Sequence, residues 1–102
     1  MYAITFDLDT NCLNEHYHQD KYNNCYLEIR KFLEKNGFTW QQGSTYFGNE
    51  DVTAVHCVTV VQDMSFEFPW FANCIRDIRM LRIEENNDLM PAVEKVLRYQ
   101  KK

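Results

Sequence analysis

The first nine residues, Met1 to Asp9, constrain the fold more than any other stretch of the chain. They alternate as a half-buried strand does, with an apolar side (Tyr2, Ile4, Phe6, Leu8) and a small, polar, acidic side (Ala3, Thr5, Asp7, Asp9). Such a strand begins a sheet and presents Asp7 on a rigid element near its end. The alternative is that Asp7 and Asp9 only solubilise the strand end or cap the next turn.

The rest of the chain divides into segments of helical or strand periodicity. Apolar positions at helical spacing predict a helix over 22–35 that ends at Asn36-Gly37. They also favour a helix over 52–64, although its valines and threonines favour a strand by local propensity. Phe38 to Tyr46 is extended with a bend or reversal at Gln42-Gly43. The remaining expectations are a polar loop over 10–21, a short turn or small helix at 68–71, a strand over 75–84 and a terminal helix over 88–102.

This order of elements is typical of a ferredoxin-like α/β sandwich (βαββαβ), an α+β fold with an antiparallel sheet, here with an added C-terminal helix. All 102 residues then form one domain, 1–102. Apolar residues occur at both odd and even positions of 75–84, so we expect both faces of that strand to be covered. A second copy stacked on the open side of the sheet would do this, and this homodimer would pair Asp7 with its own copy. In the terminal helix, the apolar side chains are expected to point inward (Leu89, Val93, Val96, Leu97).

The formal net charge of −4 argues against binding nucleic acid by bulk electrostatics, so any such site must be a local patch. Two groups of basic residues could supply one. They lie around the late strand (Arg76, Arg79, Arg82) and at the C-terminus (Lys95, Arg98, Lys101, Lys102). The second group also complements the dipole of a terminal helix, which is the interpretation we favour.

The four cysteines are widely spaced with no C-x-x-C pair (Cys12, Cys25, Cys57, Cys74). This spacing favours reduced, packed thiols over disulfides or zinc ligands. Cys12, His16 and His18 have a spacing that suits a metal ion, but no fourth ligand accompanies them. No apolar run approaches the roughly 20 residues that span a bilayer, and the N-terminus lacks the pattern of a signal peptide. We therefore expect a cytoplasmic protein without a membrane partner.

Several segments, taken in order, resemble the virulence-associated protein D (VapD) family of small ferredoxin-like endoribonucleases, which are related to CRISPR-associated ones. The segments are M-Y-A-I-T-F-D-L, Y-L-E-I-R-K-F-L-E-K-N-G-F-T-W, Q-G-S-T-Y, and P-W-F followed by I-R-D-I-R-M-L-R-I-E. The resemblance covers nearly the full chain. It departs from the family in the loop from Asn11 to Asp20 and in the terminal helix, which extends past where the family typically stops.

The resemblance implies an endoribonuclease that acts as a homodimer on single-stranded or messenger RNA. It implies Asp7 as the catalytic residue, with the segment Gln42 to Tyr46 beside it, so the implied RNA contacts include Gln42, Gly43, Ser44 and Tyr46. It further implies the toxin of a toxin–antitoxin pair, with an antitoxin protein as inhibitory partner.

Two mechanisms suit these residues. Asp7 could take the proton of the RNA 2′-hydroxyl, whose oxygen then attacks the adjacent phosphorus and gives a cyclic phosphate. Alternatively, paired Asp7 carboxylates could hold Mg²⁺, so the cofactor is either none or Mg²⁺. Ser44, the amide next to Gly43 and Arg79 are candidate phosphate contacts. Ser44 and Gln42 equally suit hydrogen bonds within a bend.

Two other functions compete with RNA cleavage. One is a non-catalytic ferredoxin-like dimer, a scaffold that binds nucleic acid or a partner protein, because a fold alone does not establish activity. The other is a haloacid-dehalogenase-type phosphotransferase, whose D-x-D motif resembles Asp7-Leu8-Asp9. That chemistry needs a larger doubly wound domain than this chain can form.

Overall fold

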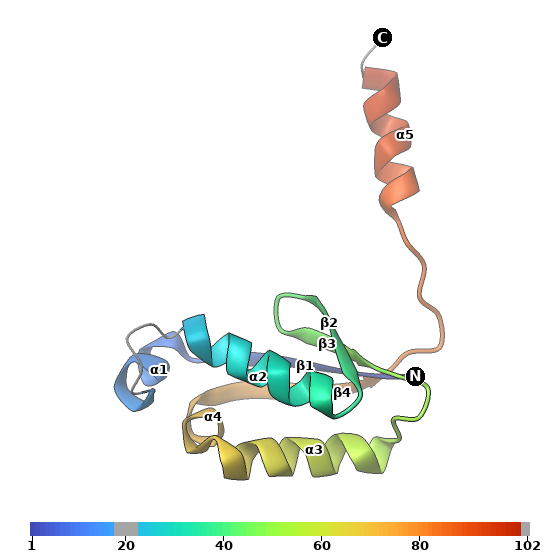
Figure 1. The fold of residues 1–102 in the computed structure, drawn as a ribbon. Helices are drawn as coiled ribbons and strands as arrows, with labels where there is room; N and C mark the ends of the chain where they lie inside the picture. The colour runs from blue at the N-terminus through green and yellow to red at the C-terminus, as the bar shows by residue number, and fades with distance from the viewer. Residues whose placement is uncertain (18–22, 101–102) are drawn as a thin grey trace.

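The computed structural model describes residues 1–17 and 23–100. In that part of the chain the elements are β1 (Tyr2–Leu8), α1 (Thr10–His16), α2 (Asn23–Lys35), β2 (Phe38–Gln42), β3 (Thr45–Gly48), α3 (Ala54–Glu67), α4 (Pro69–Cys74), β4 (Ile75–Arg82) and α5 (Met90–Gln100). The four strands form one antiparallel sheet in the order β2-β3-β1-β4 (Figure 1). This arrangement confirms the predicted α+β, ferredoxin-like fold.

Helices α2 and α3 run side by side along one face of the sheet (Figure 1). The alternation of β1 explains this layering, because Ile4, Phe6 and Leu8 point into the core beneath the helices. The opposite face of the sheet, here called the open face, carries Ala3, Thr5 and Asp7. Ala3 is nevertheless only 1% exposed.

The predicted apolar side of α2 packs into the core, where Cys25, Ile29 and Leu33 are each 0% exposed and Tyr26 and Phe32 are partly buried. Tyr22, the first residue of the helix predicted over 22–35, lies outside the described residues. The helix ends at Lys35, just before the predicted stop at Asn36-Gly37, and the φ of Gly37, +93°, favours glycine.

The ambiguous segment after Val52 is a helix, as its periodicity predicted. Thr53 caps α3 by accepting a hydrogen bond from the backbone N–H of His56. The buried residues of α3 are Cys57, Val60 and Met64, whereas Val58 on the same helix is 53% exposed. Tertiary burial therefore overrides the strand propensity of the valines.

The loop predicted over 10–21 is partly wrong, because Thr10–His16 forms helix α1. The Asp9 side chain accepts hydrogen bonds from the backbone N–H groups of Asn11 and Cys12, and so caps the helix. Leu13 anchors the helix at 0% exposure. A helix of seven residues with a single buried position is too short for periodicity to reveal.

The prediction of four reduced cysteines is also wrong for one pair. Cys12 and Cys74 form a disulfide, with their Cα atoms 5.4 Å apart and 62 positions apart in sequence. Helices α1 and α4 pack against each other and bring the two residues together, which sequence spacing alone does not reveal. Cys25 and Cys57 are free and buried, as predicted.

Strand β4 does not have both faces covered within one chain. It ends the sheet beside β1, and its Met80 and Leu81 are 44% and 49% exposed. The expected cover on both faces of this strand is therefore not seen in the single chain.

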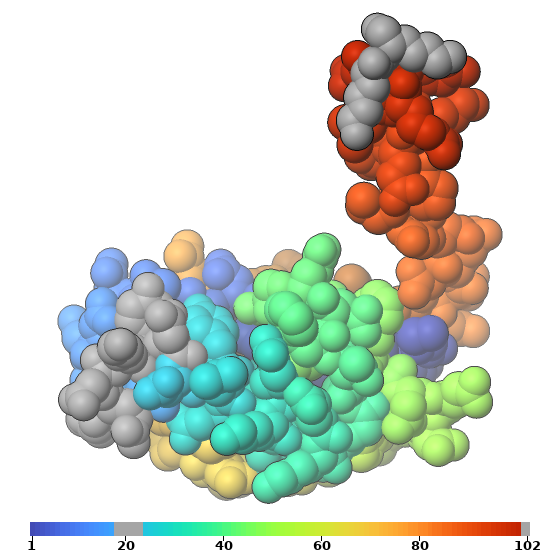
Figure 2. Space-filling model, turned by 45° about the horizontal axis from the view of Figure 1, so that its top comes forward, coloured from blue at the N-terminus to red at the C-terminus, as the bar shows by residue number. Residues whose placement is uncertain are grey.

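Helix α5 is present as predicted, but its apolar residues do not point inward. Figures 1 and 2 show it standing clear of the rest of the molecule, and none of its described residues is buried. The amphipathic pattern predicts that one side of the helix is buried but not which surface covers it. Lys101 and Lys102 lie outside the described residues. Within those residues, no helix has the length and apolar character to cross a membrane.

Candidate functional site

Asp7 lies near the end of β1 on the open face, and its side chain is 65% exposed. Its register partner on β4 is Asp77, and the next pair is Leu8 with Ile75. One residue of β4, Arg76, therefore has no register partner and forms a bulge. This bulge brings the Nε atom of Arg76 to 3.9 Å from Oδ2 of Asp7.

A second ion pair lies directly beside the first. The Nε atom of Arg79 donates to the carboxylate of Asp77, at 3.1 Å from Oδ1 and 3.3 Å from Oδ2. Arg79 is the register partner of Thr5, so it shares the face of Asp7. We call Asp7, Arg76, Asp77 and Arg79 the strand-end cluster.

All four side chains of the strand-end cluster are at least half exposed. Such ion pairs contribute little to stability and break readily. Both guanidinium groups are therefore available to bind a phosphate of an approaching ligand, next to a carboxylate that can accept a proton.

The turn between β2 and β3 lies beside Phe6, one residue before Asp7. The backbone N–H of Phe6 donates to the carbonyl oxygen of Ser44 at 3.1 Å. The reversal at Gly43, whose φ is +50°, is the bend predicted from the sequence. The carbonyl oxygen of Gly43 accepts a hydrogen bond from the indole of Trp40 at 2.8 Å, which holds the turn in place.

Two candidate residues from this turn do not join Asp7. Tyr46 pairs with Ile4, so it points to the helix-covered face, and it is 3% exposed. Burial raises the pKa of its phenol, while Arg30 opposes that shift through a hydrogen bond. Gln42 lines a separate pocket with Phe47 and the segment that leads into α5.

Other polar residues near β1 have structural roles. Asp9 caps α1, so it does not act with Asp7 as a D-x-D motif requires. His16 ends α1, Cys12 is held in the disulfide, and His18 falls outside the described residues.

The residues that the structure describes include no group of three or more His, Cys, Asp or Glu side chains suited to a metal ion. Asp7 and Asp77 are the carboxylates of the strand-end cluster, and each has an arginine beside it. These residues of one chain do not fit a Mg²⁺ site by themselves, because Mg²⁺ requires a near-octahedral set of oxygen ligands.

Sequence reasoning identified Asp7 and Arg79 but gave Asp77 no role and Arg76 only a place in a basic patch. Their position depends on the bulge between β1 and β4, and no residue type in the sequence marks that bulge. The paired Asp and Arg residues of I-R-D-I-R were the available signal.

No model of a known protein family matches the chain. Individual proteins match over nearly all of it. It is 58% identical over 93 residues to Endoribonuclease VapD 2 of Riemerella anatipestifer, which covers 91% of this chain and 99% of that protein. It is 59% identical over 97 residues to an Endoribonuclease VapD homolog of Helicobacter pylori, covering 95% of this chain and all (100%) of that protein. Endoribonuclease VapD of Dichelobacter nodosus is 41% identical over 96 residues, or 92% of this chain and 98% of that protein.

Proposed function

Because the chain belongs to the VapD family, we propose that it is an endoribonuclease whose central catalytic group is Asp7. Relatives named endoribonucleases match it over nearly their whole length, which supports RNA cleavage. The observation that supports the site is the position of Asp7, an exposed carboxylate on a rigid strand with Arg76 at 3.9 Å. A carboxylate next to a cation on one surface is suited to proton transfer beside a bound phosphate.

In the proposed reaction, Asp7 removes the proton of the RNA 2′-hydroxyl. The 2′-oxygen attacks the adjacent phosphorus, the bond to the 5′-oxygen breaks, and the departing oxygen takes a proton from water. The products are a cyclic phosphate and a free 5′-hydroxyl. Arg76 and Arg79 bind the phosphate oxygens, with Ser44 as a further contact, and the guanidinium groups stabilise the charge that develops there.

We further propose that two copies stack through their open faces. Leu81 on this face is 49% exposed, and Phe47 lies across β1 from it because both are register partners of Ala3. A twofold axis through the face would bring the two Asp7 side chains toward one shared groove. Two facing carboxylates would also give the Mg²⁺ route a pair of ligands, so that alternative depends on the dimer.

The family resemblance supports a role as the toxin of a toxin–antitoxin pair, acting on messenger RNA in the cytoplasm and inhibited by an antitoxin protein. If this is so, induced expression of the chain should arrest growth, and Asp7→Asn should not. Growth arrest by the Asp7→Asn variant as well would contradict toxicity through RNA cleavage.

The decisive experiment incubates the purified protein with single-stranded RNA and with DNA of the same sequence, each with and without EDTA. We expect RNA to be cut, DNA to remain intact and EDTA to have no effect. Loss of cleavage in EDTA would instead support Mg²⁺ held by paired Asp7 residues. If clean protein cuts no RNA, that result contradicts the nuclease and supports the scaffold function.

The matched variants for this assay are Asp7→Asn and Asp51→Asn, since both residues are exposed carboxylates. Removing a general base lowers a rate by roughly 100- to 10,000-fold, so Asp7→Asn should cut at least about 100 times more slowly. Asp51→Asn should cut at the wild-type rate. A folded Asp7→Asn variant that cuts as fast as Asp51→Asn would remove Asp7 from the chemistry.

A further inference from the structure

Helix α5 exposes an apolar stripe that its own chain leaves largely uncovered. Leu89, the residue just before the helix, is 73% exposed, and within the helix the exposed fractions are Met90 54%, Val93 49%, Val96 55% and Leu97 49%. Figure 2 shows the helix projecting from the molecule, with its base alone near the body. We call these five residues the α5 stripe. A contiguous apolar surface of this kind marks a site of association.

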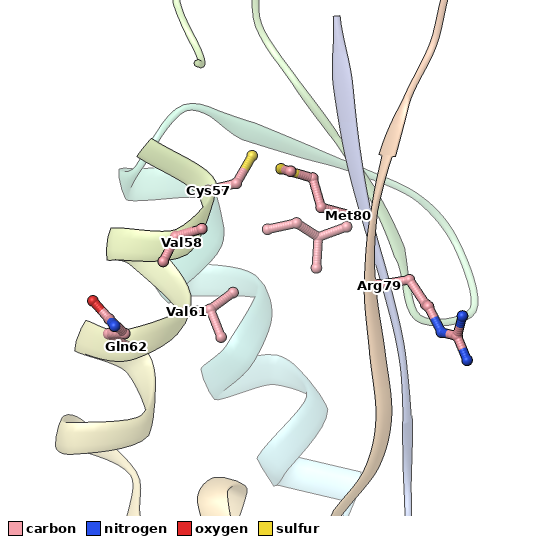
Figure 3. A pocket seen from close by; sticks show the side chains of 7 residues that line it. Cys57, Val58, Val61, Gln62, Arg79 and Met80 are labelled. Atoms are coloured by element: carbon pink, nitrogen blue, oxygen red, sulfur yellow. The ribbon is translucent and has the colours of Figure 1, made fainter. Parts of the chain in front are cut away.

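A second apolar surface lies where α3 meets β4, the last strand of the sheet. A pocket of about 190 Å³ opens there, here called the edge groove, lined by Ile4, Cys57, Val58, Val61, Gln62, Arg79 and Met80. Figure 3 shows Cys57 and Val61 directed from α3 toward Met80 on β4, whereas the side chain of Arg79 points away on the far side of the strand. The lining is therefore almost entirely hydrocarbon and sulfur. Val58 and Met80 at its rim are 53% and 44% exposed.

The edge groove also borders an unpaired strand edge. β4 is paired with β1 on one side, and no described strand pairs with its other side. Exposed strand edges promote unwanted pairing between molecules, and proteins commonly protect them by laying a helix alongside. A helix with one apolar side would fill the pocket and cover this edge at once.

The α5 of the same chain is poorly placed to fill this groove. The segment leading into α5 (86–89), together with Met90 and Val93 at the base of the helix, lines a pocket with Gln42 and Phe47, on the β2–β3 side of the sheet. The strand order puts β2 and β3 on one side of β1 and β4 on the other. Within one copy, α5 would have to leave its observed contacts and cross the sheet to reach the groove.

We propose that α5 of each chain docks lengthwise in the edge groove of a second copy, so that two chains exchange their terminal helices. This inference rests on the proposed homodimer and adds to it the segment that holds the copies together. Reciprocal exchange about a twofold axis covers both stripes and both grooves, which closes the assembly at two chains.

Area and charge both favour a second copy as the occupant. Each α5 stripe exposes roughly 500 Å², so docking both helices of a dimer covers on the order of 1,000 Å² of stripe surface, and the grooves that receive them add to that area, as stable protein interfaces require. α3 carries Asp63 and Glu67 and no Lys or Arg, whereas α5 carries Lys95 and Arg98 against the single acid Glu94. The two helices therefore carry net charges of opposite sign, which favours their approach.

Cysteine cross-linking between two differently tagged preparations of the full chain tests the proposal. One preparation carries Val58→Cys at the groove rim and the other Leu97→Cys on the stripe. Mild oxidation of the mixture should give a covalent dimer that contains one chain of each tag, identified by mass spectrometry. Lys31→Cys, on an exposed position of α2, replaces Val58→Cys as the control and should give little of this product. Equal cross-linking at Lys31, or none at Val58, would overturn the exchange.

The second test measures assembly by analytical ultracentrifugation with two matched double variants. Val93→Asn with Leu97→Asn alters the stripe, and Glu94→Asn with Lys95→Asn alters the polar side of the same helix. Both pairs introduce the same residue and leave the net charge unchanged. The stripe variant should raise the dimer dissociation constant at least about 100-fold, because its buried apolar contacts are lost, and the polar-side variant should change it by less than about tenfold.

These assays separate the inference from the proposed nuclease. Equal dimerisation by the two double variants would overturn the exchange of α5 and leave cleavage at Asp7 intact. Conversely, an Asp7→Asn variant that loses cleavage but still cross-links through Val58 and Leu97 would support both proposals.

Discussion

The disulfide between Cys12 and Cys74 should contribute a large part of the stability of the fold. It closes a loop of 62 positions and ties α1 to the end of α4. For a loop of that length, the lost entropy of the unfolded chain corresponds to about 4 kcal/mol at 25 °C. The whole free energy of unfolding of a small domain is roughly 5 to 15 kcal/mol.

The perturbation is the double variant Cys12→Ser/Cys74→Ser, followed by urea unfolding and tryptophan fluorescence. With a denaturant slope of roughly 1 to 2 kcal/mol/M, a loss of about 4 kcal/mol should lower the urea midpoint by about 2 to 4 M. Dithiothreitol should shift wild-type protein by a similar amount and leave the double variant unchanged, which controls for reagent effects. If oxidised wild type and the double variant unfold at the same urea concentration, the loop-closure reasoning is wrong.

Three further predictions concern single positions. Gly37→Ala should lower the free energy of unfolding by about 1 to 3 kcal/mol, because the φ of Gly37 is +93° and a new Cβ would lie 3.2 Å from Cγ2 of Val52. Gly43→Ala should lower the free energy of unfolding less, because the φ of Gly43 is +50° and no atom lies within 4 Å of the new Cβ. Circular dichroism melts would compare the two, and equal losses would contradict the steric argument. Burial raises the pKa of the Cys25 thiol from 9.0 to about 11, so the unfolded chain loses this proton first. The free energy of unfolding should therefore fall between pH 9 and 11. In urea titrations at pH 8 and 10, Cys25→Ala should reduce this difference in the free energy of unfolding. A difference as large as that of the wild type would contradict the role of this thiol. Asp9→Ala removes the cap of α1 and should cost about 1 kcal/mol in the same titrations, whereas no loss would show that the cap is dispensable.

The sequence predicted best the elements in which apolar side chains mark one side for burial. The alternation of β1 and the stripe of α2 each specify one buried face, and the structure confirms both. The α3 helix was predicted correctly against its valine-rich propensity, because residues such as Cys57 and Met64 recur at helical spacing.

The features that sequence reasoning missed depend on distant parts of the chain. The disulfide needs α1 and α4 side by side, and the proximity of Arg76 to Asp7 needs a bulge in one strand pair. The inward orientation expected for Val93 in α5 was wrong because a pattern indicates a buried side without naming the surface that covers it. The segment Gln42 to Tyr46 was predicted beside Asp7, and its Ser44 lies there, but alternation across β3 turns Tyr46 to the opposite face.

The bulge at Arg76 has a consequence for how β4 tolerates insertions and deletions. Because side chains alternate along a strand, deleting any one residue between Arg79 and Arg82 would exchange the inner and outer sides of everything that follows it. Deleting Arg76 itself would straighten the ladder and keep Asp77 opposite Asp7. The spacing of residues along β4, and not only their identity, therefore encodes the chemistry of this surface, and the unpaired position 76 is a place in the strand where a gap preserves that phase.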